Sequence, residues 1–336
     1  MASKREYWID VMRIFACVMV LFCHAPASGQ VNGLIGTTYG MVNAYLGMAL
    51  GPVLFFMITG ACIFNLKEGE SVTQYFKRRF SRVLIPTLVW SIVYILLQRY
   101  VWNVEVEGNL WHSLVMMLFV PQYGLLWYMY ALISIYLMAP IISVWLKVCS
   151  RKDLEVFLLI WLCTLLIPYI RAFEPEVNGI IGGNGILYYI NSWLWLAILG
   201  YYCRYYIKMK NVRWWHFVLV FSVAPITILF FKIVSGKTMT NCLSLASVFT
   251  TAGVFVLIRN FKYKETLKEP VELISKLSFG IYLSHMLFTH PFRIWISQYG
   301  LGSYIQIPVT AVFSGICAFV LVYLISRLSF GKYIIG

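Results

Sequence analysis

Charged residues are scarce in this sequence, and acidic ones most of all: only 13 of the 336 residues are Asp or Glu, and charged residues of both signs make up 12%. An average soluble domain carries about 25% charged residues. No polar stretch exceeds roughly 20 residues, too few for a soluble domain. With 61% hydrophobic residues and a mean hydropathy of +0.77, the chain is expected to be an all-α integral membrane protein.

Paired cysteines are also missing. The eight cysteines lie in or beside apolar stretches and include no CxxC pair, so we expect small packing residues, and neither a disulfide framework nor a metal site. The net charge of +14 would indicate nucleic-acid binding in a soluble protein, but in a membrane protein it follows from the positive-inside rule. We therefore expect no nucleic-acid partner and no metal.

Ten apolar stretches are long enough to cross a membrane as helices. If the chain starts inside, the intracellular stretches carry 21 of the 27 Lys and Arg, and the outer stretches carry five. The sequence thus predicts one transmembrane domain over 1–336, a bundle of about ten helices with both termini in the cytoplasm. No cleavable signal peptide and no appended soluble domain are expected. The predicted spans are about 8–26, 41–64, 83–101, 123–146, 154–172, 187–203, 214–231, 241–258, 277–297 and 305–326.

A polar stripe runs along the first apolar stretch, Trp8 to Pro26. Asp10, Arg13 and His24 fall within roughly 60° of one another on a helical wheel. Charges in hydrocarbon cost roughly 2.5–3.5 kcal/mol each on insertion scales, so they normally face a protein interior or a water-filled cavity. We expect Asp10 and Arg13, at i and i+3, to form an ion pair beside a vestibule that opens to the cytoplasm.

His24 lies about 24 Å along this helix from Trp8, near the outer surface. A neutral imidazole there can accept a hydroxyl proton as a general base. The alternative is a packed histidine bonded to a neighbouring backbone, but the position in the stripe favours catalysis. Asp10 is about 21 Å away on the same helix, so any group that orients the ring must come from another span.

Three arginines, Arg78, Arg79 and Arg82, lie where the third span enters the membrane. Arg79 and Arg82 share a helix face at i and i+3, and arginine forks bind phosphate through two hydrogen bonds. This pattern predicts a site for a phosphorylated donor. A topology signal or contact with anionic lipid explains the cluster equally well.

Ser278, Tyr282 and His285 share one face of the ninth span. His285 is expected at mid-membrane, about 13 Å beyond Lys276. It either lines a tunnel for the reacting groups or forms a hydrogen bond between helices. Two outer loops, 102–112 and 173–186, place Gly, Asn and Glu beside aromatic residues, which suits a carbohydrate but is also usual at a membrane interface.

Together these stretches resemble the acyltransferase 3 family of integral membrane acyltransferases. Asp10-Val11-Met12-Arg13 followed by His24 is similar to the family's opening, and GPVLFFMITG at 51–60 to its LFFxxSG stretch, with Thr59 in place of serine. Further similarities, which extend the resemblance to nearly the whole chain, are Arg79 and Arg82 with Pro86, LWYMYAL at 126–132 with YLMAP at 136–140, LGYY at 199–202 and IYLSH at 281–285.

This resemblance implies transfer of an acetyl group from cytoplasmic acetyl-CoA, a co-substrate, to a hydroxyl of an extracytoplasmic glycan or lipid-linked sugar. It implies that His24 is the essential histidine and that Arg13 is an important arginine of the first span, with the donor arm passing the face that carries Asp10 and Arg13. It also implies that Arg79 and Arg82, with Arg78, bind coenzyme A. Trp127, Tyr282 and His285 are expected to line the path of the substrates. Direct transfer and a covalent acyl-enzyme both remain open.

The resemblance also implies a bacterial cytoplasmic membrane as the location, with membrane lipids and a possible second copy of the chain as partners. Three alternatives stay open at this point. The first is transfer of another acyl group, such as succinyl. The second is a glycolipid or small-anion transporter that uses the same intramembrane charges. The third is a membrane sensor or assembly partner without catalysis.

Overall fold

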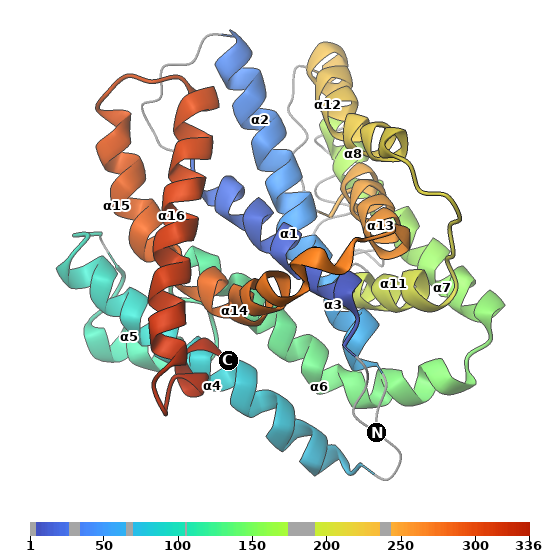
Figure 1. Cartoon of the computed structure of the whole chain (residues 1–336), viewed down its shortest axis with the longest axis horizontal. Helices are drawn as coiled ribbons and strands as arrows, with labels where there is room; N and C mark the ends of the chain where they lie inside the picture. The colour runs from blue at the N-terminus through green and yellow to red at the C-terminus, as the bar shows by residue number, and fades with distance from the viewer. Residues whose placement is uncertain (1–4, 27–33, 65–69, 105, 174–191, 236–242) are drawn as a thin grey trace.

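The computed structural model describes residues 5–26, 34–64, 70–104, 106–173, 192–235 and 243–336. Within these residues every regular element is a helix (Figure 1). In chain order the helices are α1 (Tyr7–His24), α2 (Leu34–Met48), the π-helix η1 (Ala49–Val53), α3 (Leu54–Ile63), α4 (Val72–Tyr100), α5 (Leu110–Met116), η2 (Gly124–Leu126), α6 (Trp127–Val148), α7 (Arg151–Thr164), α8 (Ile167–Phe173), α11 (Leu194–Tyr205), α12 (Trp214–Ser235), α13 (Leu245–Asn260), η4 (Glu265–Leu267), α14 (Lys268–Ser284), α15 (Met286–Ser297), α16 (Ser303–Ser326) and α17 (Lys332–Ile335).

Seven helical stretches of the described residues are long and apolar enough to cross a membrane. The all-helical, multi-pass membrane fold is therefore confirmed, while the expected count of about ten is not. The seven stretches are Tyr7–His24, Gly36–Ile63, Val72–Tyr100, Gly124–Val148, Arg151–Ile170, Trp214–Val234 and Ser303–Ser326.

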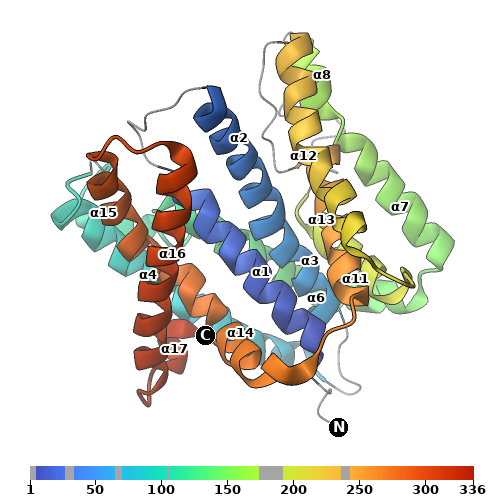
Figure 2. The same cartoon turned by 45° about the horizontal axis from the view of Figure 1, so that its top comes forward.

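The three remaining predicted spans correspond to shorter helices. The prediction at 187–203 falls partly outside the described residues and otherwise on α11, which has 12 residues, and 241–258 falls on α13, which has 16. The stretch 277–297 is divided at His285, where α14 ends and α15 leaves in another direction (Figures 1 and 2). Apolar composition continues through such a break, so hydropathy alone does not find it.

Helix α1 lies in the middle of the molecule, in contact with α2, η1, α14 and α16 (Figures 1 and 2). Two glycines allow this close packing. A Cβ atom at Gly47 would stand 2.6 Å from Cys23 Cβ, and one at Gly51 would stand 2.8 Å from Val20 Cγ2. Small residues at such contacts let two helix backbones approach each other inside a membrane. They hold the end of α1 that carries His24 against the π-helix.

The contact between α3 and α11 is closer still. A Cβ atom at Gly60 would stand 1.8 Å from the Ala197 carbonyl oxygen, and one at Gly200 would stand 2.0 Å from the Met57 carbonyl oxygen. The two glycines therefore face each other's helix backbone with no side chain between them. This contact fixes α3, which contributes side chains to the site described below.

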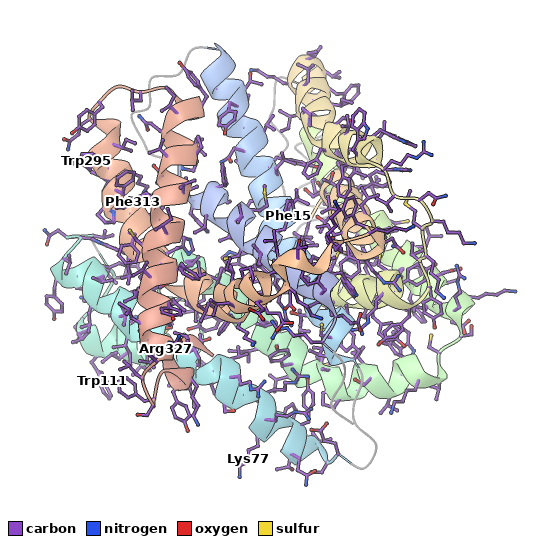
Figure 3. All side chains as sticks on the ribbon, viewed as in Figure 1. Phe15, Lys77, Trp111, Trp295, Phe313 and Arg327 are labelled. Carbon is purple, nitrogen blue, oxygen red and sulfur yellow. The ribbon has the colours of Figure 1, made fainter. Side chains whose placement is uncertain are left out.

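The two ends of the molecule differ in character. Figure 3 shows Lys77 at the bottom of the view and Trp295 and Phe313 towards the upper left.

The loop after α4 is held in place by Arg99, whose guanidinium donates to the carbonyl oxygens of Gly108 at 2.8 Å and Asn109 at 3.1 Å. Of the two loops expected to meet a carbohydrate, this one is thus internally bonded, and the other lies outside the described residues from 174 onward.

Candidate active site

A cationic cavity of about 270 Å³ opens between α1, α3, α4, α6 and α14. We call it the basic cavity. Its cations come from three separate parts of the chain: Arg5 and Arg13, Arg79 and Arg82, and Lys276. No acidic side chain is among its described lining residues, so these five cations give the cavity a positive character. The other lining residues are Phe55, Ile58, Thr59, Cys62, Ile63, Val83, Tyr128, Leu132, Tyr136, Ser275, Ser278, Phe279, Tyr282 and Gly336.

Asp10 has a different ion-pair partner from the one expected. Arg5 Nε donates to Asp10 Oδ2 at 2.6 Å, and Arg5 Nη2 donates to Oδ1 at 2.7 Å. Ser275 Oγ also donates to Oδ1, at 2.6 Å. Arg5 precedes the helix and can present both N–H groups to the carboxylate, the two-bond geometry that arginine favours. The prediction of an Asp10–Arg13 ion pair was therefore wrong.

This arrangement separates the roles of the first-span residues. Asp10 is 1% exposed and joins α1 to α14 through Ser275. The hydrogen bond with Asp10 raises the pKa of Arg5, which stays charged. Arg13, by contrast, has no ion pair within the described part of the chain and lines the basic cavity. Its charge is available to an anion in that cavity.

The arginines of α4 are also divided in two. The helix starts at a capping box, in which the Ser71 and Gln74 side chains accept from each other's backbone N–H, and the following turns place Arg79 and Arg82 on the cavity. Arg78 points elsewhere and pairs with Glu70 at 2.8 Å. Of the three predicted donor-binding arginines, two line the cavity and Arg78 does not.

His24 lines a second, much smaller cavity of about 30 Å³, which we call the histidine chamber. Most of its walls are apolar, and they come from α1, α2, η1, η2, α6 and α14. Trp127, predicted to line the substrate path, is part of the wall. The complete lining is Val20, Cys23, His24, Met48, Pro52, Leu125, Trp127, Tyr128 and Tyr282.

Two tyrosines belong to both cavities. Tyr128 and Tyr282 line the basic cavity on one side and the histidine chamber on the other. Their rings meet edge to face with centroids 5.5 Å apart, and Tyr282 Oη donates to the Leu125 carbonyl at 2.6 Å. The expected single passage is thus two cavities with a common wall, which we call the tyrosine wall.

His285 lies next to His24 in space, although the two residues are far apart in the sequence. The ring centroids are 5.4 Å apart, and His285 is fully buried at the junction of α14 and α15. Its Nδ1 lies 2.7 Å from the Tyr282 carbonyl oxygen, so Nδ1 carries the hydrogen and donates it. Its Nε2 is buried without a hydrogen-bond partner among the described residues. This nitrogen can therefore accept a hydrogen bond, and it belongs to the ring next to His24.

Sequence reasoning overlooked several residues of this arrangement. Arg5 was noted as a topology signal and as part of the N-terminal motif, Lys276 was counted among the topology signals, and Tyr128 was quoted in a motif; none of the three was assigned a role in the site. The available signal for Tyr128 was its place next to Trp127 at the start of α6. No pattern in the sequence could pair Asp10 with Ser275, because the two belong to opposite ends of the chain.

Comparison with known proteins identifies the family of the chain. The model of the acyltransferase domain of the acyltransferase 3 family matches residues 6–327, nearly the whole chain. A search of curated proteins and a search of solved structures each give no significant match. The matched range contains the two histidines, the cavity arginines other than Arg5, and both tyrosines of the wall. The chain is a membrane protein of the acyltransferase 3 family.

Proposed function

We propose that the chain transfers an acetyl group from acetyl-CoA in the cytoplasm to a hydroxyl of a glycan or lipid-linked sugar on the other face of a bacterial cytoplasmic membrane. The observation that carries this proposal is the tyrosine wall, which belongs both to an arginine-rich cavity and to the chamber of His24. A donor bound in the first cavity would have its reactive end at the entrance to the second.

The basic cavity suits a phosphorylated donor. Arg79 and Arg82 come from one helix face, and Arg13 approaches from α1. Guanidinium groups bind phosphate oxygens through paired hydrogen bonds, and Lys276 adds a point charge. Coenzyme A carries three phosphate groups at one end and a narrow pantetheine arm at the other. The arm is the narrowest part of such a donor, and it would pass the tyrosine wall by moving the rings of Tyr128 and Tyr282 apart.

His24 is the proposed general base. The acceptor hydroxyl oxygen attacks the thioester carbonyl carbon while His24 takes the hydroxyl proton. The carbon–sulfur bond then breaks, and the coenzyme A thiolate leaves and receives the proton from His24. The products are the acetyl ester and free coenzyme A. The apolar walls of the chamber exclude the bulk water that would hydrolyse the thioester.

His285 is the proposed orienting partner of His24. A base that accepts a proton on one ring nitrogen is best held by a hydrogen bond from the other. Because His285 Nδ1 is occupied by the Tyr282 carbonyl, its Nε2 can accept only. An N–H of His24 directed at this atom would leave the opposite nitrogen of His24 free for the acceptor hydroxyl.

Orientation and span count belong to the same proposal. The excess of Lys and Arg on alternate loops supports cytoplasmic termini, and the basic cavity would then open to the compartment that contains acetyl-CoA. Helices α11, α13 and the α14–α15 pair would complete a bundle of about ten segments. The chain as a whole would be one transmembrane domain.

The direct test is acyl transfer by purified protein in lipid nanodiscs with radiolabelled acetyl-CoA and an extract of cell-envelope glycans. Wild-type protein should place the label on glycan as an alkali-labile ester, and His24→Ala should not. A transporter would instead be stabilised against heat by sugar anions and indifferent to coenzyme A. Melting curves with each compound separate the two functions.

A further inference from the structure

The histidine chamber is small enough to select the acyl group. The chamber has a volume of about 30 Å³, against about 270 Å³ for the basic cavity on the same measure. An acetyl group contributes three non-hydrogen atoms, two carbons and one oxygen. A butyryl group contributes two more carbons, and a succinyl group adds a carboxylate as well.

The side chains that form the chamber walls have little room to move. Trp127 packs against Trp193 with ring centroids 5.0 Å apart, and Tyr128 packs against Phe56 at 4.6 Å. Pro52 belongs to the buried π-helix η1, whose Ala49 carbonyl accepts a hydrogen bond from Thr251 at 2.8 Å. Each wall is thus supported from behind by another ring or by a hydrogen bond, and closely packed interiors transmit strain.

The chemistry of the walls is equally selective. Apart from His24, the residues around the chamber are aromatic, aliphatic or sulfur-containing. Among the described residues no Lys or Arg lines the chamber, whereas five line the basic cavity. A carboxylate in the chamber would lose its hydration without a Lys or Arg of the lining to pair with, which is unfavourable.

We propose that the histidine chamber selects the acyl group by size and charge, and that Trp127 and Met48 at its walls favour the acetyl thioester over longer and anionic ones. This inference rests on the proposed function, since it requires the thioester to approach His24. A longer acyl chain would hold the thioester carbon on the donor side of the tyrosine wall, out of reach of His24.

The experiment measures binding of coenzyme A and of its acetyl, propionyl, butyryl, hexanoyl and succinyl thioesters to the full chain in nanodiscs, by titration calorimetry without acceptor. For wild type we expect acetyl-CoA to bind more tightly than butyryl-CoA by roughly tenfold or more, the effect of misfit methylenes in an apolar pocket. Hexanoyl-CoA and succinyl-CoA should bind no better than butyryl-CoA.

Trp127→Ala should bring butyryl-CoA to within about threefold of acetyl-CoA by removing one wall. The matched control is Trp145→Ala, which removes an identical side chain from the same helix, α6, at a position outside the chamber lining, where the ring packs against Phe157. It should keep the wild-type ratio. If Trp127→Ala does not fold, Met48→Ala enlarges the chamber from α2 and should shift the ratio in the same direction.

Each result is decisive. Equal affinity of wild type for acetyl-CoA and hexanoyl-CoA overturns the inference, and so does an unchanged ratio in both folded wall variants. In those cases coenzyme A still binds, and the proposed function stands. If free coenzyme A does not bind wild type at all, the proposed donor site is wrong and the inference falls with it.

Discussion

The imidazole rings of His24 and His285 lie 5.4 Å apart, inclined at 42° to each other. One ring comes from the end of the first helix and the other from a helix junction near the end of the chain. Since Asp10 is held at the opposite end of α1 by Arg5 and Ser275, no carboxylate of that helix serves His24. In the proposed mechanism the imidazole of His285 takes that place.

Removing the imidazole of His24 should abolish transfer without unfolding the protein. A positioned general base contributes roughly 100- to 10,000-fold to the rate, so we expect His24→Ala to lose at least about 100-fold in the glycan labelling assay. The control is His216→Ala, because His216 bonds only to Arg213 of its own chain segment. Normal labelling by His24→Ala would remove this residue from the mechanism.

The substitution His285→Asn tests the roles of the two ring nitrogens of His285 separately. In His285→Asn the amide N–H replaces Nδ1–H and can still donate to the Tyr282 carbonyl, but the acceptor at Nε2 is lost. We expect a loss of roughly 10- to 100-fold in kcat, the usual effect of removing a partner that orients an imidazole, with a changed pH profile and unchanged KM for acetyl-CoA. His290→Asn is the control. An unaltered pH profile in the folded variant would leave His285 a packing role only.

Arg82→Ala should weaken binding of coenzyme A and make the affinity less dependent on salt, because one phosphate contact is lost. Arg78→Ala provides a matched control from the same turn of α4, since Arg78 pairs with Glu70 outside the basic cavity. Calorimetric titrations at several ionic strengths measure both effects. Equal behaviour of the two variants would assign the cluster to topology or lipid contact.

The ion pair of Arg5 and Asp10 predicts an asymmetry in stability. The Arg5 side chain is 36% exposed and the Asp10 side chain only 2%. Arg5→Ala leaves a buried carboxylate without its cation, whereas Asp10→Asn frees an arginine that reaches water. Because an unpaired buried charge is the costly state, Arg5→Ala should lower the melting temperature more than Asp10→Asn. The opposite order would show that Ser275 alone holds the carboxylate.

Alanine at Gly60 should prevent α3 and α11 from packing, since its Cβ would overlap the Ala197 carbonyl. We expect little folded protein in fluorescence-detected gel filtration. Gly124→Ala is the control, because no atom lies within 4 Å of a Cβ at Gly124. A monodisperse Gly60→Ala protein with a wild-type melting temperature would contradict the described contact.

The sequence predicted what depends on composition and on local spacing. Low charge and long apolar stretches indicated a helical membrane protein, and the i, i+3 spacing of Arg79 and Arg82 indicated a shared face, which the basic cavity confirms. His24 was singled out because a polar side chain in an apolar helix is costly. Each of these signals lies within one segment of the chain.

What the sequence did not predict depends on contacts between distant segments. The partner of Asp10 is decided by Arg5 before the helix and by Ser275 on α14. The change of direction at His285 occurs within an apolar stretch and leaves no mark in hydropathy. Tyr128 and Tyr282 come into contact only because α6 packs near α14. The periodicity of each helix does not indicate which helices pack against each other.

The tyrosine wall also has a consequence for the cell that contains this protein. Moving one elementary charge across a membrane potential of 100 mV is worth about 2.3 kcal/mol, so a wet channel lined with arginines would drain ion gradients. Within the described residues, Tyr128 and Tyr282 close the arginine-lined compartment before it reaches His24. In the proposed mechanism the bilayer would thus stay closed to ions at rest, and the two rings would separate only when a substrate arm passes between them.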